Sequence, residues 1–77
     1  MSGPSRVTFT RHAETRAAER GVSVQGAADL VLVEHPRRRR NPGPADWTVR
    51  GQGMGVAYDW PGSGDATLAV VVTVWRE

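Results

Sequence analysis

The sequence predicts an α+β domain in which two N-terminal helices pack on one face of a three- to four-stranded antiparallel β-meander. Three features predict this fold: two short helical patterns in the first half, repeated turn signals in the second half, and a strongly β-prone C-terminal segment. A chain of 77 residues buries only about 60% of the surface that it exposes when unfolded, which suffices for one modest core. We therefore expect a single domain over residues 1–77, with a loose N-terminus at residues 1–5.

A short strand and a helix are predicted after this terminus. Residues 6–9 alternate between polar and apolar side chains, which favours a short edge strand. Thr10 can cap a helix over residues 11–20, because its hydroxyl can accept a hydrogen bond from an amide of the first turn. Gly21 suits the left-handed residue that ends such a helix, so we expect a positive φ at this position.

A second helix is predicted over residues 24–34, where apolar residues recur at helical spacing. Ser23 can cap its start, and Pro36 prevents its continuation. The next segment, residues 36–46, holds four arginines, three prolines and a glycine. Because this composition disfavours regular structure, we expect residues 36–46 to form a mobile loop.

Three strands are expected in the remaining chain. Residues 47–51 alternate, and the Gln-Gly pair at 52–53 can turn the chain into a strand over residues 54–60. The segment 61–65 is a strong turn signal, rich in glycine and proline. Residues 67–76 are apolar on both faces, which predicts an interior strand of the sheet.

Composition excludes several classes of protein. The longest apolar run is far shorter than a membrane span, and the N-terminus lacks the basic-then-apolar order of a signal peptide. We therefore expect a cytoplasmic protein with no membrane partner. The chain has no cysteine and only two histidines, His12 and His35, so we expect neither a metal site nor another cofactor.

The positive charge is concentrated in one segment. All ten basic residues are arginines, and four of them are consecutive at residues 37–40. Without these four, the net charge changes from +2 to −2. Such a block suits either a solvated loop or an electrostatic guide for nucleic acid, because arginine binds phosphate without reading base sequence.

The predicted sheet adds further candidates. Aromatic residues that face away from the helices can stack on bases, and nearby arginines can bind phosphates. Simple alternation along the last strand places the Thr73 hydroxyl on the same face as Val71 and Trp75. We take as candidate nucleic-acid-binding residues Arg37, Arg38, Arg39, Arg40, Arg50 and Trp75.

A stripe on the first predicted helix suits chemistry on a phosphodiester. His12, Arg16 and Arg20 are spaced four residues apart, which aligns them on one helix face. Arginines bind phosphate oxygens, and an imidazole transfers a proton near neutral pH. The alternative is a solvated helix face on which Glu19 offers compensating charge.

The residues from His12 to Ser23, HAETRAAERGVS, resemble the signature H-A-x-x-R-x-x-x-R-G-[IV]-S of a small uncharacterised bacterial and phage domain. That domain is grouped with RelE-like toxins in the barnase–EndoU–colicin–RelE nuclease superfamily. The segment from Val71 to Trp75 is similar to the family's closing strand, which commonly reads V-V-T-V followed by an aromatic residue. The resemblance implies a helix–helix–sheet fold and, for some relatives, metal-independent RNA cleavage. The positions that it implies to be catalytic are His12, Arg16, Arg20 and Thr73.

Two functions are therefore expected to compete. The first is a small metal-independent ribonuclease of toxin type, in which His12 moves a proton at the ribose 2′-hydroxyl and the arginines stabilise charge on the phosphate. The second is a non-catalytic phage- or toxin-system protein that binds a host protein or nucleic acid. The expected partners are RNA and an antitoxin or immunity protein, in the cytoplasm of the producing, host or target bacterial cell.

Overall fold

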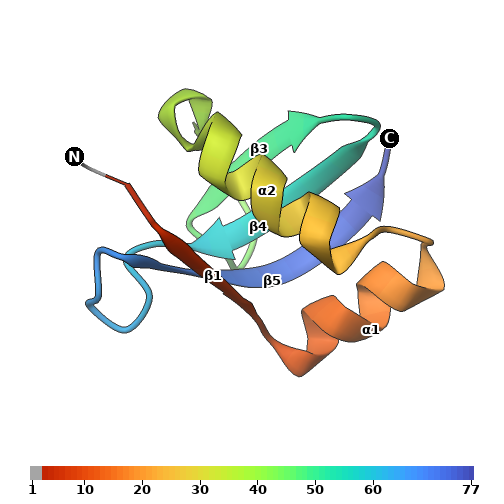
Figure 1. Cartoon of the computed structure of the whole chain (residues 1–77), viewed down its shortest axis with the longest axis horizontal. Coiled ribbons are helices and arrows are strands. Elements are labelled where there is room, and N and C mark those ends of the chain that lie inside the picture. Colours follow the sequence, from red (N-terminus) through yellow and green to blue (C-terminus); the bar gives the residue numbers. More distant parts are fainter. Residues whose placement is uncertain (1–2) are drawn as a thin grey trace.

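The computed structural model describes residues 3–77, which form a five-stranded sheet and two α-helices (Figure 1). Of the predicted loose N-terminus, Met1 and Ser2 lie outside the described residues, whereas the Ser5 amide donates a hydrogen bond to the Thr67 carbonyl (2.9 Å). In chain order the elements are β1 (Arg6–Phe9), α1 (Arg11–Glu19), α2 (Val24–Glu34), the 3-10 helix η1 (His35–Arg37), β2 (Arg39–Arg40), β3 (Trp47–Gly51), β4 (Met54–Asp59) and β5 (Leu68–Arg76).

The sheet is mixed. Its strand order is β1-β5-β4-β3-β2, and β1 runs parallel to β5 whereas the other neighbouring pairs are antiparallel. The prediction of an antiparallel meander of three to four strands with both helices packed on one face is therefore wrong. Alternation in residues 6–9 indicates a strand but not its direction, because the same pattern suits parallel and antiparallel pairing. The long chain between β1 and β5 allows the crossover that a parallel pair requires.

The prediction of an interior C-terminal strand is confirmed. β5 lies between β1 and β4, and its residues Ala69, Val71 and Val74 are fully buried. The predicted turn at residues 52–53 joins β3 to β4, with φ values of 54° at Gln52 and 75° at Gly53. Two positive φ values are typical of the two-residue turns that suit the twist of a hairpin.

The two helices occupy different places on the sheet (Figure 1). α2 crosses one face and contacts β3, β4 and β1. α1 contacts chiefly β5, along the part of this strand that β1 leaves uncovered. There the Thr10 hydroxyl donates to the Val72 carbonyl (3.5 Å) and the Arg20 guanidinium donates to the Val74 carbonyl (2.8 Å). These bonds satisfy carbonyl groups of β5 that would otherwise lie at a sheet edge.

The predicted helix ends are confirmed. The hydroxyls of Thr10 and Ser23 accept hydrogen bonds from the amides of Ala13 (3.0 Å) and Gly26 (3.1 Å). Gly21, between the helices, has a φ of 64°. Glycine adopts this left-handed conformation without the steric cost that a Cβ adds, so the chain breaks into two helices here.

The two faces of the sheet differ in chemistry. A Cβ at Gly51 would lie 2.9 Å from Cδ1 of Leu30 in α2, so α2 packs on the face to which Gly51 and Val49 belong. That face carries the buried residues Val49, Val56, Tyr58, Val71 and Val74. The opposite face carries Thr48, Arg50, Gly55, Ala57, Thr73 and Trp75. The second face therefore presents polar and aromatic groups.

A β-bulge in β5 corrects the predicted surroundings of Thr73. Ala57 pairs with Thr73, but the next residue, Tyr58, pairs with Val71, so Val72 is an extra residue in β5. Val71 consequently belongs to the core, whereas Thr73 lies on the opposite face. The prediction that Thr73 and Val71 share a face is wrong, because alternation along one strand carries no sign of a bulge.

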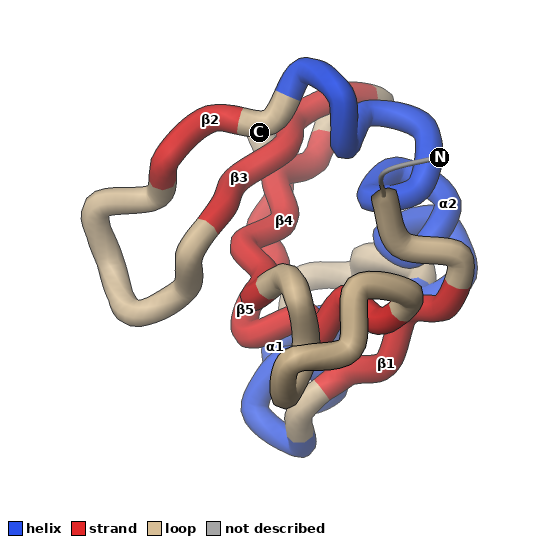
Figure 2. Tube along the Cα trace, turned by 90° about the vertical axis from the view of Figure 1, so that its left-hand side faces the viewer, coloured by secondary structure: helices blue, strands red, loops and turns tan. Residues whose placement is uncertain are grey.

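The segment predicted to be a mobile loop contains two short elements. η1 follows α2 directly, and β2 pairs with the start of β3. The remaining connection, residues 41–46, projects from the sheet on the side away from α2 (Figure 2). The expectation that residues 36–46 lack regular structure is thus corrected where η1 and β2 form, and their mobility stays a prediction.

Candidate nucleic-acid interface

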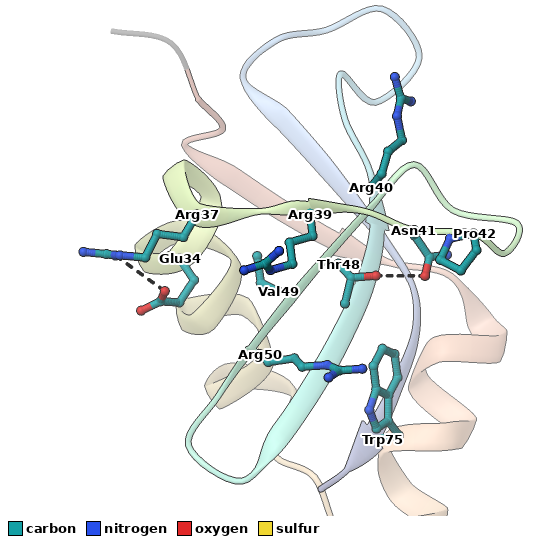
Figure 3. Close-up of a pocket in the computed structure, with 10 residues that line it drawn as sticks. All are labelled: Glu34, Arg37, Arg39, Arg40, Asn41, Pro42, Thr48, Val49, Arg50 and Trp75. Carbon is teal, nitrogen blue, oxygen red and sulfur yellow. Dashed lines mark hydrogen bonds and ion pairs between the residues drawn. The ribbon is translucent and has the colours of Figure 1, made fainter.

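A cavity of about 520 Å³ opens at the edge of the sheet formed by β2 and β3 (Figure 3). We call it the arginine groove; it is lined by Glu34, Arg37, Arg39, Arg40, Asn41, Pro42, Thr48, Val49, Arg50 and Trp75. Its volume lies within the range of about 300–1,000 Å³ that is usual for ligand sites. Of the six residues predicted to bind nucleic acid, all except Arg38 line it. The fold therefore brings together residues that lie far apart in the sequence.

Strand pairing arranges the outward side chains near the groove in two rows. One row contains Arg39, Thr48, Ala57 and Thr73. The other contains Arg50, Gly55 and Trp75. The rows are two residues apart along β3, which corresponds to about 7 Å. Arg39 and Arg50 thus present two cationic groups on one face, from neighbouring positions.

The groove carries a net positive charge. It is lined by four arginines and one acidic residue, Glu34, which lies 3.5 Å from the Arg37 guanidinium. Arg50 lies 3.6 Å from the Glu77 carboxylate, and two-thirds of its side chain is exposed. Within residues 3–77, Arg39 and Arg40 form no ion pair. No acidic side chain of these residues therefore neutralises either guanidinium.

The four arginines do not point in one direction. In Figure 3, Arg50 extends toward the Trp75 ring, whereas Arg40 points away from both. The Arg40 guanidinium lies 5.1 Å from the ring centre of Trp47, a cation–π contact on the other side of the strand. Arg39 extends toward Val49 and the Glu34 side of the groove in the same view, so Arg50 is the groove arginine that lies beside Trp75.

Trp75 is held in one orientation. A Cβ at Gly55 would overlap the Cε2, Cζ2 and Nε1 atoms of Trp75, so the indole lies against the Gly55 backbone. The indole Nε1 donates a hydrogen bond to Glu77 Oε2 (2.8 Å), the same oxygen that Arg50 approaches. Glu77 therefore holds the aromatic ring and the guanidinium side by side.

Asn41 fixes the wall of the groove after β2. Its side-chain oxygen accepts a hydrogen bond from the Thr48 hydroxyl (2.8 Å), and its side-chain nitrogen donates to the Ala45 carbonyl (3.2 Å). The Asn41 backbone amide also donates to the Asp46 carbonyl (3.0 Å). These bonds attach the connection from β2 to β3 at both of its ends, which holds Arg39 and Arg40 in the strand.

Arg38 differs from its three neighbours. Its guanidinium lies 4.3 Å from the ring centre of Trp47 and 5.1 Å from that of Trp60, and it donates to the His35 carbonyl (3.2 Å). A guanidinium stacked on aromatic rings contributes to packing as well as to charge. The structure places Arg38 against the aromatic residues beside the core, and its role in nucleic-acid binding stays a prediction.

A buried polar pair joins η1 to β4, and the sequence gives little sign of it. His35 Nδ1 and the Tyr58 hydroxyl are 2.7 Å apart, and both residues are buried. Burial, together with the nearby Arg38 charge, lowers the pKa of His35. Burial raises the pKa of Tyr58 to about 12. A neutral imidazole can thus accept the hydroxyl proton of a neutral tyrosine. The histidine and tyrosine are 23 residues apart in the chain, so no local spacing connects them.

Removing the tyrosine hydroxyl should destabilise the fold. Tyr58→Phe leaves His35 Nδ1 buried without its partner, which we expect to lower the free energy of unfolding by about 1–3 kcal/mol. Urea denaturation measures this loss. A cycle with His35→Leu supplies the control: the double variant should be more stable than the sum of the single effects predicts. Additive losses would show that the two side chains do not stabilise each other.

The four residues implied to be catalytic are absent from the lining of the arginine groove. His12 is exposed on α1, and the Arg16 guanidinium forms an ion pair with Glu19 (2.6 Å). Arg20 donates to a backbone carbonyl of β5. Thr73 lies on the sheet face opposite α2, in the row that contains Arg39. Their joint role in catalysis stays a prediction.

Over residues 3–77, neither helix is long and apolar enough to cross a membrane. The resemblance to RelE-like toxins stays a prediction. Comparison with protein-family models, with curated proteins and with solved structures finds no match for this chain.

Proposed function

We propose that the protein binds RNA through the arginine groove. One observation carries the proposal: Arg37, Arg39, Arg40, Arg50 and Trp75 come from four elements and line one cavity. Arginines bind phosphate oxygens through paired, charge-assisted hydrogen bonds, and an aromatic ring stacks on a base. A groove with both kinds of group suits a nucleic acid better than a small uncharged ligand.

The binding is electrostatic and largely independent of sequence. Phosphate contacts position a nucleic acid but carry no base information. The Asn41 side-chain oxygen and the Thr48 hydroxyl could read a base edge. However, the hydroxyl already donates a hydrogen bond to that oxygen. The groove therefore supports affinity more than base specificity.

The salt dependence of RNA binding tests this proposal. Fluorescence anisotropy with a labelled single-stranded RNA should give an affinity that falls as salt rises, because bound phosphates release their counterions. The slope of log affinity against log salt should be about −0.7 for each phosphate contact. Similar affinities for unrelated sequences are expected. Binding that does not change with salt would contradict the proposal.

A second candidate function is metal-independent RNA cleavage of the toxin type, with His12 as proton-transfer group. The observation that favours it is the orientation of α1: Ala13 and Ala17 are buried, whereas His12 lies on the exposed side. An exposed imidazole can reach a substrate, as a general acid or base must. Under either function, an antitoxin, immunity protein or host protein remains a proposed partner.

A further inference from the structure

We infer that the arginine groove takes single-stranded RNA, with one base stacked on Trp75 and a flanking phosphate bound by Arg50. The inference rests on the proposed function, because it concerns the same groove. It adds that the RNA is single-stranded and that the Trp75 ring selects this form. Two features of the groove and one property of duplex RNA carry it.

The first feature is the fixed ring. The Trp75 indole lies against the Gly55 backbone on one side, and its Nε1 is bound by Glu77. Because Trp75 also lines the cavity, its other side is the surface offered to a ligand. The ring needs no ordering when a ligand arrives, so binding avoids that entropy cost. A fixed aromatic ring with one open face is well suited to base stacking.

The second feature is the charge beside the ring. Arg50 and Trp75 are joined through Gly55 in one row of the sheet, and both contact Glu77 Oε2. The absence of a side chain at Gly55 keeps the guanidinium and the indole on one continuous surface. A nucleotide whose base stacks on Trp75 therefore has a cation beside it for its phosphate.

The third point is that the bases of a duplex cannot stack on Trp75. Bases in an RNA duplex are stacked on each other, so their faces are closed to a protein ring, whereas unpaired bases can be splayed out onto aromatic side chains. The phosphates of a duplex remain accessible to the arginines. The groove should thus bind a single strand through stacking and charge, but a duplex through charge alone.

One titration series tests this inference. The probe is a labelled mixed-sequence RNA of about 10 nucleotides that does not pair with itself, within the usual site size for such surfaces, and its G·C-rich duplex with the complementary strand, which stays paired during the titration. Wild-type protein should bind the single strand more tightly. Trp75→Leu should weaken single-strand binding by about 10–100-fold, with no change in salt slope, because no charge is removed. Its affinity for the duplex should stay as in the wild type.

Trp75→Phe is the matched control, because it keeps an aromatic ring over Gly55; it should retain most of the single-strand affinity. Thermal denaturation checks that each variant folds, and if Trp75→Leu does not fold, the wild-type preference between the two probes decides. Equal wild-type affinity for both probes, or unchanged single-strand affinity in Trp75→Leu, would overturn the inference and leave the proposed function intact. Failure of the wild type to bind either probe would instead overturn the proposed function.

Discussion

Replacing three groove arginines by glutamine, Arg37→Gln, Arg39→Gln and Arg50→Gln together, should weaken single-stranded RNA binding by about 50-fold at about 0.15 M salt. The estimate follows from counterion release. Each phosphate contact on a single strand contributes about 0.7 to the slope of log affinity against log salt, so three contacts contribute about 2, which between about 1 M and about 0.15 M salt amounts to about 50-fold. Anisotropy titrations across a range of salt concentrations measure both the affinity and the slope.

A charge-matched variant separates the groove from net charge. The combination of Arg6→Gln, Arg11→Gln and Arg76→Gln also removes three positive charges. Arg6 pairs with Asp65 and Arg76 bonds the Gly21 carbonyl; neither they nor Arg11 line the groove. The RNA affinity of this control should fall only slightly, because the variant loses long-range electrostatic attraction but no phosphate contact in the groove. Equal losses in the two triple variants would show that RNA binds the charge of the whole protein rather than the groove.

Replacing the exposed imidazole on α1 tests the second candidate function. If His12 transfers a proton during cleavage, His12→Ala should lower the rate of RNA cleavage by about 10²–10⁴-fold, the usual contribution of a general acid or base. The assay is incubation of purified protein with labelled RNA in the presence of a chelator. Because His12 is exposed, the free energy of unfolding should change by no more than about 0.5 kcal/mol.

Two arginines of α1 complete this experiment: Arg16 as a second test and Arg11 as the control. Arg16→Ala should also reduce the rate, but the double variant with His12→Ala should lose less than the product of the single effects if both groups act on one transition state. Arg11→Ala, adjacent in sequence and also exposed, should have little effect. No cleavage by the wild type, or full cleavage by His12→Ala, would remove this candidate and leave RNA binding as the function to pursue.

Local features of the fold could be predicted from the sequence because each depends on neighbouring residues. A hydroxyl three residues before a helical amide can cap it, and Thr10 and Ser23 do so. A glycine between two helical patterns suits a left-handed conformation, and Gly21 adopts it. The interior place of β5, between β1 and β4, was predictable because the most continuously apolar strand of a sheet is usually an interior one.

The arrangement of the candidate site could be predicted only in part. The arginine block and Trp75 were identifiable by residue type, since few side chains bind phosphates or stack on bases. Which of them line one groove was not predictable. Arg38, in the middle of the block, packs on Trp47 and Trp60, whereas Arg50, a separate residue, joins the groove.

The sequence by itself determined the helices with their caps, the hairpin between β3 and β4 and the interior strand, because these follow from interactions within short stretches of chain. Only the tertiary structure decided the parallel pairing of β1 with β5 and the bulge at Val72, which depend on partners distant in sequence. The bulge places Thr73 on the face opposite α2, in the row of Arg39. Pairing register, and not spacing along one strand, determines which side chains lie together, so the arginine groove exists only once β2, β3, β4 and β5 have paired.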